Sequence, residues 1–160
     1  MLNRSNATTR DKRFIIGSIL SGAKKGRTML DGYFPASMKN IRSEIHSILH
    51  SNRTLGGDRA SALIYKRDGK RVGVAILSSG RDGDTGPALY AMAVAPGNRG
   101  KGYGRLIVDG IDRRYPVDHY HGRRARNTMA LRKLFARPKN YRHPVVPDAE
   151  ASAGSYQEAA

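Results

Sequence analysis

One segment constrains the fold of this chain more than any other: residues 88–111, ALYAMAVAPGNRGKGYGRLIVDGI. It begins with an apolar run that ends at Pro96, which is typical of a buried strand. A turn in which glycines alternate with other residues follows, and after it apolar side chains return at helical spacing. The segment therefore predicts a strand that passes through a glycine-rich turn into the N-terminus of a helix.

Such a connection favours the binding of an anion. The first N–H groups of a helix have no intrahelical acceptor, and the helix dipole adds partial positive charge there. Gly100, Gly102 and Gly104 let a phosphate approach the backbone without a Cβ atom in the way. Three flanking cations add full charges: Arg99, Lys101 and Arg105. The spacing fits neither the GxxxxGK[ST] loop nor the GxGxxG dinucleotide loop, so nucleotide hydrolysis and dinucleotide redox chemistry are disfavoured.

The rest of the chain adds helices and strands around that segment. Periodicity and turn signals predict helices at 14–23 and 36–50, strands at 61–66 and 71–79, a short strand at 117–121 and a basic helix at 124–136. Asp68-Gly69 between the two longer strands indicates a hairpin. This order predicts an α/β (α+β) fold with helices packed on a mixed, mostly antiparallel sheet. The expected domain organisation is a flexible N-terminus at 1–12, a single domain at 13–144 and a disordered acidic tail at 145–160.

Residues Arg99–Gly104, with the strand before them and the helix after them, resemble the [Q/R]xxGx[G/A] signature of the GNAT N-acetyltransferases. The resemblance implies a GNAT-like fold, here shortened at its C-terminal strands because the tail leaves little room for the last two. It also implies acetyl-CoA as co-substrate. In that family the backbone amides of the loop hold the pyrophosphate, and the preceding strand pairs with the pantetheine arm.

Carried over by position, the resemblance assigns cofactor contacts to a strand and a loop of this chain. Pantetheine and thioester contacts fall on Met92, Ala93 and Val94. Pyrophosphate contacts fall on Arg99, Gly100, Lys101, Gly102, Tyr103, Gly104 and Arg105. Asn127 and Ala130 match the family's Asn-x-x-Ala pattern, which makes Asn127 both a cofactor-binding and a catalytic candidate. Leu134 stands where the family often has a tyrosine that protonates the CoA thiolate, and the Gly-Phe that usually follows is absent.

The strand at 89–93 lacks the glutamate that many GNAT enzymes place there, so the general base must come from elsewhere. Tyr90, Asp84 and His119 are the catalytic candidates, with Asp82 and Asp118 as alternatives. Tyr90 fits equally well as a half-buried strand aromatic. The histidine pairs His46/His50 and His119/His121 each lack a third ligand, so no metal site is expected.

The charge of the chain is strongly positive, with 29 Lys and Arg against 13 Asp and Glu, or +16. Residues 1–144 contain all 29 cations and 10 of the acids, which gives +19 and attracts polyanions. Segment 113–142 has ten Lys and Arg, one Asp and three tyrosines. That composition suits contact with RNA, surroundings for the 3′-phosphate of CoA, or a solvated helix face.

These observations favour an acyl-CoA-dependent N-acyltransferase that moves an acetyl group to a primary amine of a protein or small molecule. Two alternatives remain: a toxin-like enzyme that acetylates aminoacyl-tRNA, and a non-catalytic GNAT-like module that binds nucleic acid or protein. The sequence has no cysteine, no apolar run of membrane-spanning length and no recognisable secretory signal. A cytoplasmic monomer or homodimer without membrane contact is therefore expected.

Overall fold

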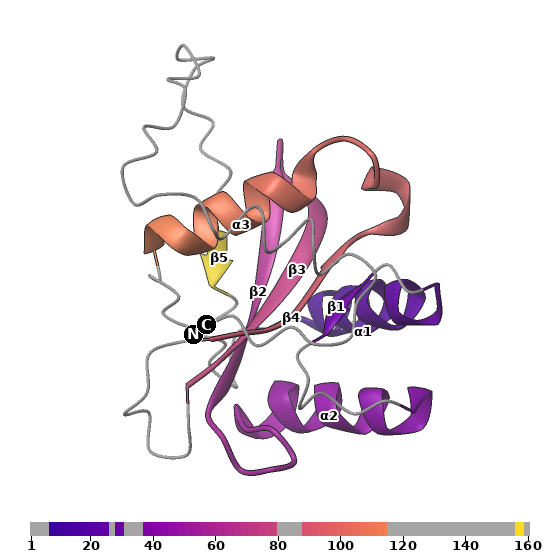
Figure 1. Ribbon diagram of the computed structural model, residues 1–160, viewed down its shortest axis with the longest axis vertical. Coiled ribbons are helices and arrows are strands. Elements are labelled where there is room, and N and C mark those ends of the chain that lie inside the picture. The colour runs from indigo at the N-terminus through magenta and orange to yellow at the C-terminus, as the bar shows by residue number, and fades with distance from the viewer. Residues whose placement is uncertain (1–6, 26–27, 31–36, 80–87, 115–155, 159–160) are drawn as a thin grey trace.

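The computed structural model describes residues 7–25, 28–30, 37–79, 88–114 and 156–158 (Figure 1). Three α-helices, one short 3₁₀ helix and five strands follow one another in the order α1 (Thr9–Lys24), β1 (Met29–Leu30), α2 (Met38–Ser51), β2 (Ala60–Arg67), β3 (Lys70–Ser78), β4 (Ala88–Val94), η1 (Pro96–Asn98), α3 (Tyr103–Arg114) and β5 (Tyr156–Glu158). The predicted strand at 117–121 and helix at 124–136 lie outside the described residues.

The strands form one sheet in the order β1-β4-β3-β2-β5, with antiparallel pairing at every step. Strands β2 and β3 are the predicted hairpin, and its turn has Asp68 at φ 51° and Gly69 at φ 71°. Two consecutive positive φ angles are what the tight turn of a twisted hairpin requires. The expected α/β fold with a mostly antiparallel sheet is confirmed.

Side chains on the two faces of the sheet form separate hydrophobic cores. One core joins α1 and α2 to one face through buried isoleucines: Ile15, Ile19, Ile41, Ile45 and Ile48. The other joins α3 to the opposite face through Ile107, Val108 and Ile111. Figure 1 shows α3 crossing the sheet on one side, away from α1 and α2. The sheet therefore lies between two helical layers, and these layers bury the apolar periodicity seen in the sequence.

Helix α1 is longer than the predicted helix at 14–23, because its first turn is capped. The Thr8 side chain accepts a hydrogen bond from the Asp11 backbone N–H (3.1 Å), and the Asp11 carboxylate accepts from the Thr8 N–H (3.2 Å). Residues 9–12, expected in a flexible N-terminal segment, are thus helical. Arg71 of β3 holds the same carboxylate, with 2.6 Å between Nη2 and Oδ1. Burial would raise the pKa of Asp11, but hydrogen bonds from Thr8 and Arg71 and the charge of Arg71 lower it.

Two close contacts fix the helices against the rest of the fold. At Gly22 in α1, an added Cβ would lie 1.7 Å from Thr28 Oγ1, whose hydroxyl donates to the Ile19 carbonyl. At Gly73 in β3, an added Cβ would lie 2.5 Å from Ile107 Cδ1 and 2.9 Å from the Ala93 carbonyl oxygen. Glycine therefore lets the chain pass close to α1 before β1, and lets α3 pack directly on β3.

Two strands were not predicted. Strand β1 pairs with β4 through Met29 opposite Met92 and Leu30 opposite Ala91. Strand β5 pairs with β2 in the region expected to be a disordered tail, so that expectation is wrong for residues 156–158. Both strands lie at edges of the sheet, where the backbone of the neighbouring strand offers hydrogen bonds to any extended segment. No helix in the described ranges combines the length and apolar composition that a membrane crossing requires.

Candidate functional site

The connection from β4 to α3 has the predicted order of strand, glycine turn and helix. Gly100 and Gly102 both have φ +78°, a conformation that side chains rarely adopt, and a Cβ added at either would meet no atom within 4 Å. Gly104 differs, because it lies in the first turn of α3 and its Cβ would be 3.8 Å from Val94 Cγ2. The turn therefore needs glycine at two of the three predicted positions and is open on the side where a Cβ would project.

The N-terminus of α3 presents its first amides at this turn. The Gly102 carbonyl accepts from the N–H groups of Arg105 (3.1 Å) and Leu106 (3.4 Å), which starts the helical hydrogen-bond pattern. The N–H groups of Tyr103 and Gly104 come before that pattern, so helix geometry gives them no intrahelical acceptor. These donors and the helix dipole favour an anion at the turn.

Arg99 contributes a half-buried cation to the same turn. Its Nε donates to the Val94 carbonyl oxygen at 3.0 Å, which holds the guanidinium against the end of β4. Its Nη2 atom is buried and has no hydrogen-bond partner, and it is the one buried polar side-chain atom in this state among the described residues. A buried, unsatisfied donor on a cation is unfavourable, and an anion bound at the turn would satisfy it. The residues present therefore fit a phosphate group.

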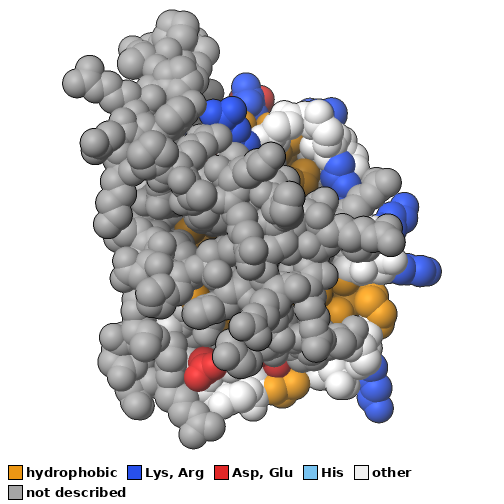
Figure 2. Space-filling view, viewed as in Figure 1, with side chains coloured by type: hydrophobic (Ala, Val, Ile, Leu, Met, Phe, Trp, Pro, Cys, Tyr) orange, Lys and Arg blue, Asp and Glu red, His pale blue; other side chains and the backbone are white. Residues whose placement is uncertain are grey.

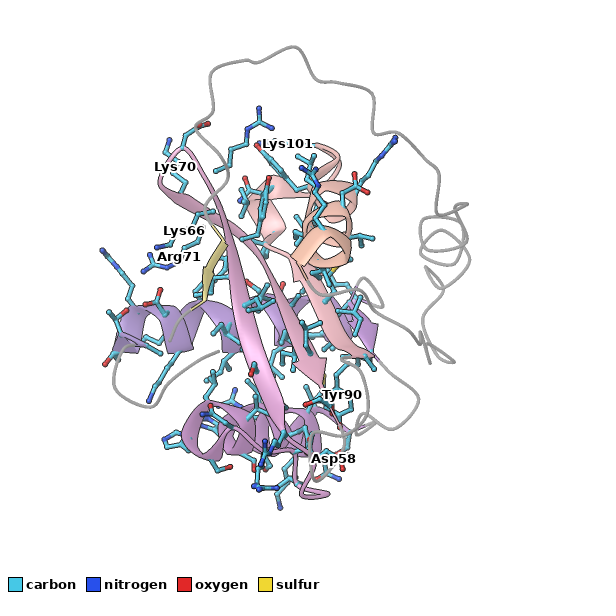
Figure 3. The ribbon with its side chains drawn as sticks, turned by 90° about the vertical axis from the view of Figure 1, so that its left-hand side faces the viewer. Asp58, Lys66, Lys70, Arg71, Tyr90 and Lys101 are labelled. Atoms are coloured by element: carbon cyan, nitrogen blue, oxygen red, sulfur yellow. The ribbon has the colours of Figure 1, made fainter. Side chains whose placement is uncertain are left out.

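Other cations surround the turn at the same end of the sheet. Lys101 is exposed, and Arg105 reaches Asp109 one helical turn later (3.8 Å). The β2–β3 hairpin brings Lys66, Lys70 and Arg71 to this end, as Figure 3 shows. In Figure 2, Lys and Arg side chains lie along the upper border of the described surface, over α3 and the hairpin, and others lie along its right-hand border, over α1 and α2. This end of the domain thus has a positive field that attracts phosphorylated ligands.

Tyr103 connects the hairpin to the start of α3. The Arg67 guanidinium lies over its ring, 5.8 Å from the centroid, and the Tyr65 ring is 6.5 Å away. Burial raises the pKa of Tyr65, so its hydroxyl stays protonated at neutral pH. The Tyr103 ring therefore packs beside the hairpin, while its backbone N–H lies at the helix N-terminus.

Along β4, the backbone N–H and C=O groups of Met92 and Val94 point to one edge of the strand, and those of Ala93 point to the other edge. The Ala95 N–H donates to Val72 of β3 at 2.9 Å, and polar groups of successive strand residues alternate between edges. Val94 and Met92 therefore direct their backbone groups away from β3. On that outer edge, β1 lies opposite Met92 and Ala91 but ends before Val94, whose carbonyl is held by Arg99.

Tyr90 lies in a β-bulge of β4. Strand β3 pairs Ile76 with Ala91 and Leu77 with Leu89, so the register shifts by one residue at Tyr90. The bulge turns the Tyr90 side chain toward the core shared with α1 and α2, where its hydroxyl donates to Glu44 Oε1 at 2.9 Å. The half-buried strand aromatic expected at this position is in fact 92% buried.

Glu44 is a candidate that sequence reasoning missed. It lies on α2, is 2% exposed, and also accepts a hydrogen bond from the Leu55 backbone N–H at 3.1 Å. A sequence signal was present, because Glu44 occupies the apolar stripe formed by Ile41, Ile45 and Ile48. A carboxylate on a buried stripe indicates a specific partner, which only the three-dimensional structure identifies as Tyr90.

The remaining candidate residues lie outside the described part of the chain or on α2. Asp84, His119 and Asn127 lie outside the described residues, as does segment 113–142 beyond Arg114. His46 and His50 are exposed on α2, and His50 Nδ1 bonds to the His46 carbonyl at 2.8 Å. Where side chains are described, no three His, Asp or Glu residues are grouped as a metal site would need.

Comparison with known proteins agrees with the geometry of the turn. The sequence model of the acetyltransferase (GNAT) family matches residues 28–136, which is about two thirds of the chain. A comparison with curated proteins gave no match. The match covers β1, α2, the β2–β3 hairpin, β4, the glycine turn and α3, and its members transfer acetyl groups from acetyl-CoA. From the glycine turn at the start of α3, the antiparallel sheet and this match together, the chain belongs to the GNAT family of acetyltransferases.

Proposed function

We propose that this protein transfers the acetyl group of acetyl-CoA to a primary amine of a protein or small molecule. The observation that carries the proposal is the buried, unpartnered Nη2 atom of Arg99, next to the open turn at Gly100 and Gly102. A pyrophosphate at this turn would satisfy Arg99 and the first amides of α3 together. Lys101 and Arg105 would add electrostatic attraction from the rim of the site.

Strand β4 supports the expected binding of the pantetheine arm of acetyl-CoA. Val94 directs its backbone N–H to the outer edge beyond the end of β1, and an extended chain of amides such as pantetheine can bind a strand edge through such a group. With the pyrophosphate at the turn, the arm would start at the Val94 end of β4. The outward-facing N–H of Val94 would meet the arm, because Arg99 holds the Val94 carbonyl and β1 pairs with β4 at Met92. Contacts from Met92 and Ala93 remain predictions.

Acetyl transfer requires chiefly that the protein hold the amine and the thioester in position. The amine must be neutral and must lie against the thioester carbonyl, and holding two reactants in that geometry supplies a large part of the rate acceleration. A backbone N–H of the strand can stabilise the developing oxyanion. A thiol is acidic enough, with a pKa of about 8.5, to leave without a strong acid. Of the predicted catalytic residues, Tyr90 has a described position on β4; Asp84, His119 and Asn127 remain predictions.

The test of cofactor binding compares two substitutions at one position. Gly102→Asp adds a negative charge where the pyrophosphate would lie, and Gly102→Asn adds the same bulk at the same positive φ without the charge. Because a ligand of the native state stabilises it by mass action, acetyl-CoA should raise the Tm of the natural chain and of Gly102→Asn. The shift with Gly102→Asp should be absent, and the charge alone should weaken binding about tenfold or more relative to Gly102→Asn.

Gly104→Ala is the control for adding a side chain in the first turn of α3. Its Cβ makes only an ordinary contact with Val94, so cofactor binding should persist. If millimolar acetyl-CoA does not shift the Tm of the folded natural chain, or if Gly102→Asp binds as well as Gly102→Asn, the assignment of the turn is wrong.

The acceptor is tested by release of CoA thiol. Lysine peptides and polyamines represent protein and small-molecule amines, and charged tRNA represents the alternative suggested by the excess of 19 positive charges over residues 1–144. We expect turnover with a free amine at low and moderate salt. Turnover confined to charged tRNA, with a steep loss as salt rises, would instead support the aminoacyl-tRNA hypothesis.

A further inference from the structure

Strand β1 covers part of the edge of β4 along which the cofactor arm is expected to run. Met29 lies opposite Met92 and Leu30 lies opposite Ala91, so β1 runs beside β4 (Figure 1). The N–H and C=O groups of Met92 point away from β3, and antiparallel geometry therefore makes Met29 and Met92 the hydrogen-bonded pair. In such a pair each residue donates its N–H to the other, so β1 takes both polar groups of Met92.

Little of this edge is left for a ligand. The Val94 carbonyl accepts from Arg99 Nε at 3.0 Å, and in the described pairing the Val94 N–H is taken by neither Arg99 nor β1. The pantetheine arm carries two amides in series, whereas the Val94 N–H can serve one acceptor. An arm that follows β4 past Val94 therefore meets β1 at Met92.

Strand β1 is held to the sheet by few contacts. It has two residues and a single hydrogen-bonded pair, and such bonds contribute little net stability because water replaces them when the pair opens. Its attachment to α1 is separate. Thr28 is 4% exposed, and its hydroxyl donates to the Ile19 carbonyl at 3.1 Å. The pairing with β4 can therefore open while Thr28 stays beside α1.

Resting on the proposed function, we infer that β1 and the pantetheine arm compete for the outer edge of β4. In the free protein Met29 pairs with Met92, and acetyl-CoA binds when this pair opens. The arm then takes the N–H and C=O groups of Met92 that β1 releases. The apparent affinity for acetyl-CoA is reduced by the fraction of molecules in which the edge is open. Strand β1 is thus an autoinhibitory contact, and its strength sets the affinity of the enzyme for its co-substrate.

A reversible disulfide between β1 and β4 tests this competition. Leu30 and Ala91 form a non-hydrogen-bonded antiparallel pair, in which the Cα atoms lie about 4.5 Å apart, within the range that a disulfide spans. The natural chain has no cysteine, so Leu30→Cys with Ala91→Cys can form one intrachain disulfide. Both redox forms are titrated by calorimetry with two probes. Desulfo-CoA has the arm but no thiol that could reduce the disulfide, and adenosine 3′-phosphate 5′-diphosphate has the phosphates but no arm.

Oxidation should affect the arm alone. With β1 fixed on β4, the affinity for desulfo-CoA should fall about tenfold or more, toward that of the probe without the arm, and reduction should restore it. Binding of adenosine 3′-phosphate 5′-diphosphate should be the same in both redox forms. The inference is overturned if the oxidised form binds desulfo-CoA as tightly as the reduced form, or if oxidation weakens both probes equally.

Two substitutions at Met29 give an independent comparison in the full chain. Met29→Pro removes the backbone N–H that pairs with Met92, and Met29→Ala keeps that N–H. Met29→Pro should bind acetyl-CoA about three- to tenfold more tightly than Met29→Ala, the range that one hydrogen bond supplies, and should bind the probe without the arm equally well. Equal or weaker acetyl-CoA binding by Met29→Pro would show that β1 does not compete with the arm.

Hydrogen exchange reports the same event in the natural chain. The Met29 amide should exchange faster when desulfo-CoA is bound, while the Met92 amide stays protected because the arm replaces Met29 as its partner. Slower exchange at Met29 would mean that β1 stays in place, which contradicts the inference but leaves the proposed function standing. If the natural chain neither binds desulfo-CoA nor shifts its Tm with acetyl-CoA, the proposed function fails and the inference fails with it.

Discussion

The contact between β3 and α3 gives the sharpest test of how the site is positioned. In Gly73→Ala the new Cβ would lie 2.5 Å from Ile107 Cδ1 and 2.9 Å from the Ala93 carbonyl oxygen. Real Cβ atoms do not approach that closely, so the Ile107 side chain must turn aside and the backbone of β4 at Ala93 must shift. Overpacking of this kind destabilises a core by about 1–3 kcal/mol. We expect a lower urea midpoint with an unchanged m-value, measured by circular dichroism.

A second substitution separates the two clashes. Ile107→Val removes the Cδ1 atom and should by itself destabilise by about 0.5–1.5 kcal/mol. Combined with Gly73→Ala, it relieves the closer clash, so the double variant should be more stable than additivity predicts, by about 0.5 kcal/mol or more. The stability that the double variant still lacks measures the contact with the Ala93 carbonyl oxygen. That oxygen is a backbone atom, so no side-chain substitution removes the contact. Acetyl-CoA affinity should fall in Gly73→Ala and partly recover in the double variant.

Gly17→Ala is the matched control, because Gly17 lies inside α1 and its Cβ would meet no atom within 4 Å. That change should stabilise the protein by about 0.5–1 kcal/mol through helix propensity. The reasoning about Gly73 is refuted if Gly73→Ala is as stable as the natural chain. Strict additivity with Ile107→Val would refute it as well.

Three further outcomes follow from single contacts. Asp11→Asn should lose about 1–3 kcal/mol at pH 7. Because the folded-state pKa of Asp11 is lowered below 3.8, this contribution is present above that value and should vanish as the pH falls through the folded-state pKa, seen in urea midpoints across pH 2–7. Gly22→Ala should destabilise by about 1–3 kcal/mol through its overlap with Thr28, and Thr28→Ser should not relieve it because Oγ1 is the overlapping atom. Arg99→Met should weaken acetyl-CoA binding about 10–100-fold by calorimetry, yet change the stability of the free protein little, because it removes an unsatisfied buried donor.

Local signals in the sequence were enough to predict most of the described elements. The isoleucine spacing of α2, the Asp68-Gly69 turn and the glycine turn at 97–104 each determine their own backbone over a few residues, and the structure has all three. The start of α1 was not predicted although Thr8 and Asp11 have capping-box spacing, because the apolar periodicity begins only at Phe14.

Contacts between residues far apart in the sequence could not be predicted from such local signals. The two residues of β1 carry no periodicity, and their pairing depends on the exposed edge of β4. Glu44 and Tyr90 are 46 positions apart, and a regular pleat would not show where a bulge directs the Tyr90 side chain. The unpartnered nitrogen of Arg99 also depends on how β4 and the turn fold back on each other.

The packing of α1 has a practical consequence for where this domain can be cut. The family match begins at residue 28, after α1, yet Ile15 and Ile19 of that helix are completely buried against the sheet. A chain trimmed to the matched residues would expose the inner face of β2, β3 and β4 to water and leave Arg71 without its carboxylate. Its apolar surface would favour association with other chains. The smallest soluble fragment should therefore begin at or before Thr8, and a protease should spare α1 until the whole fold opens.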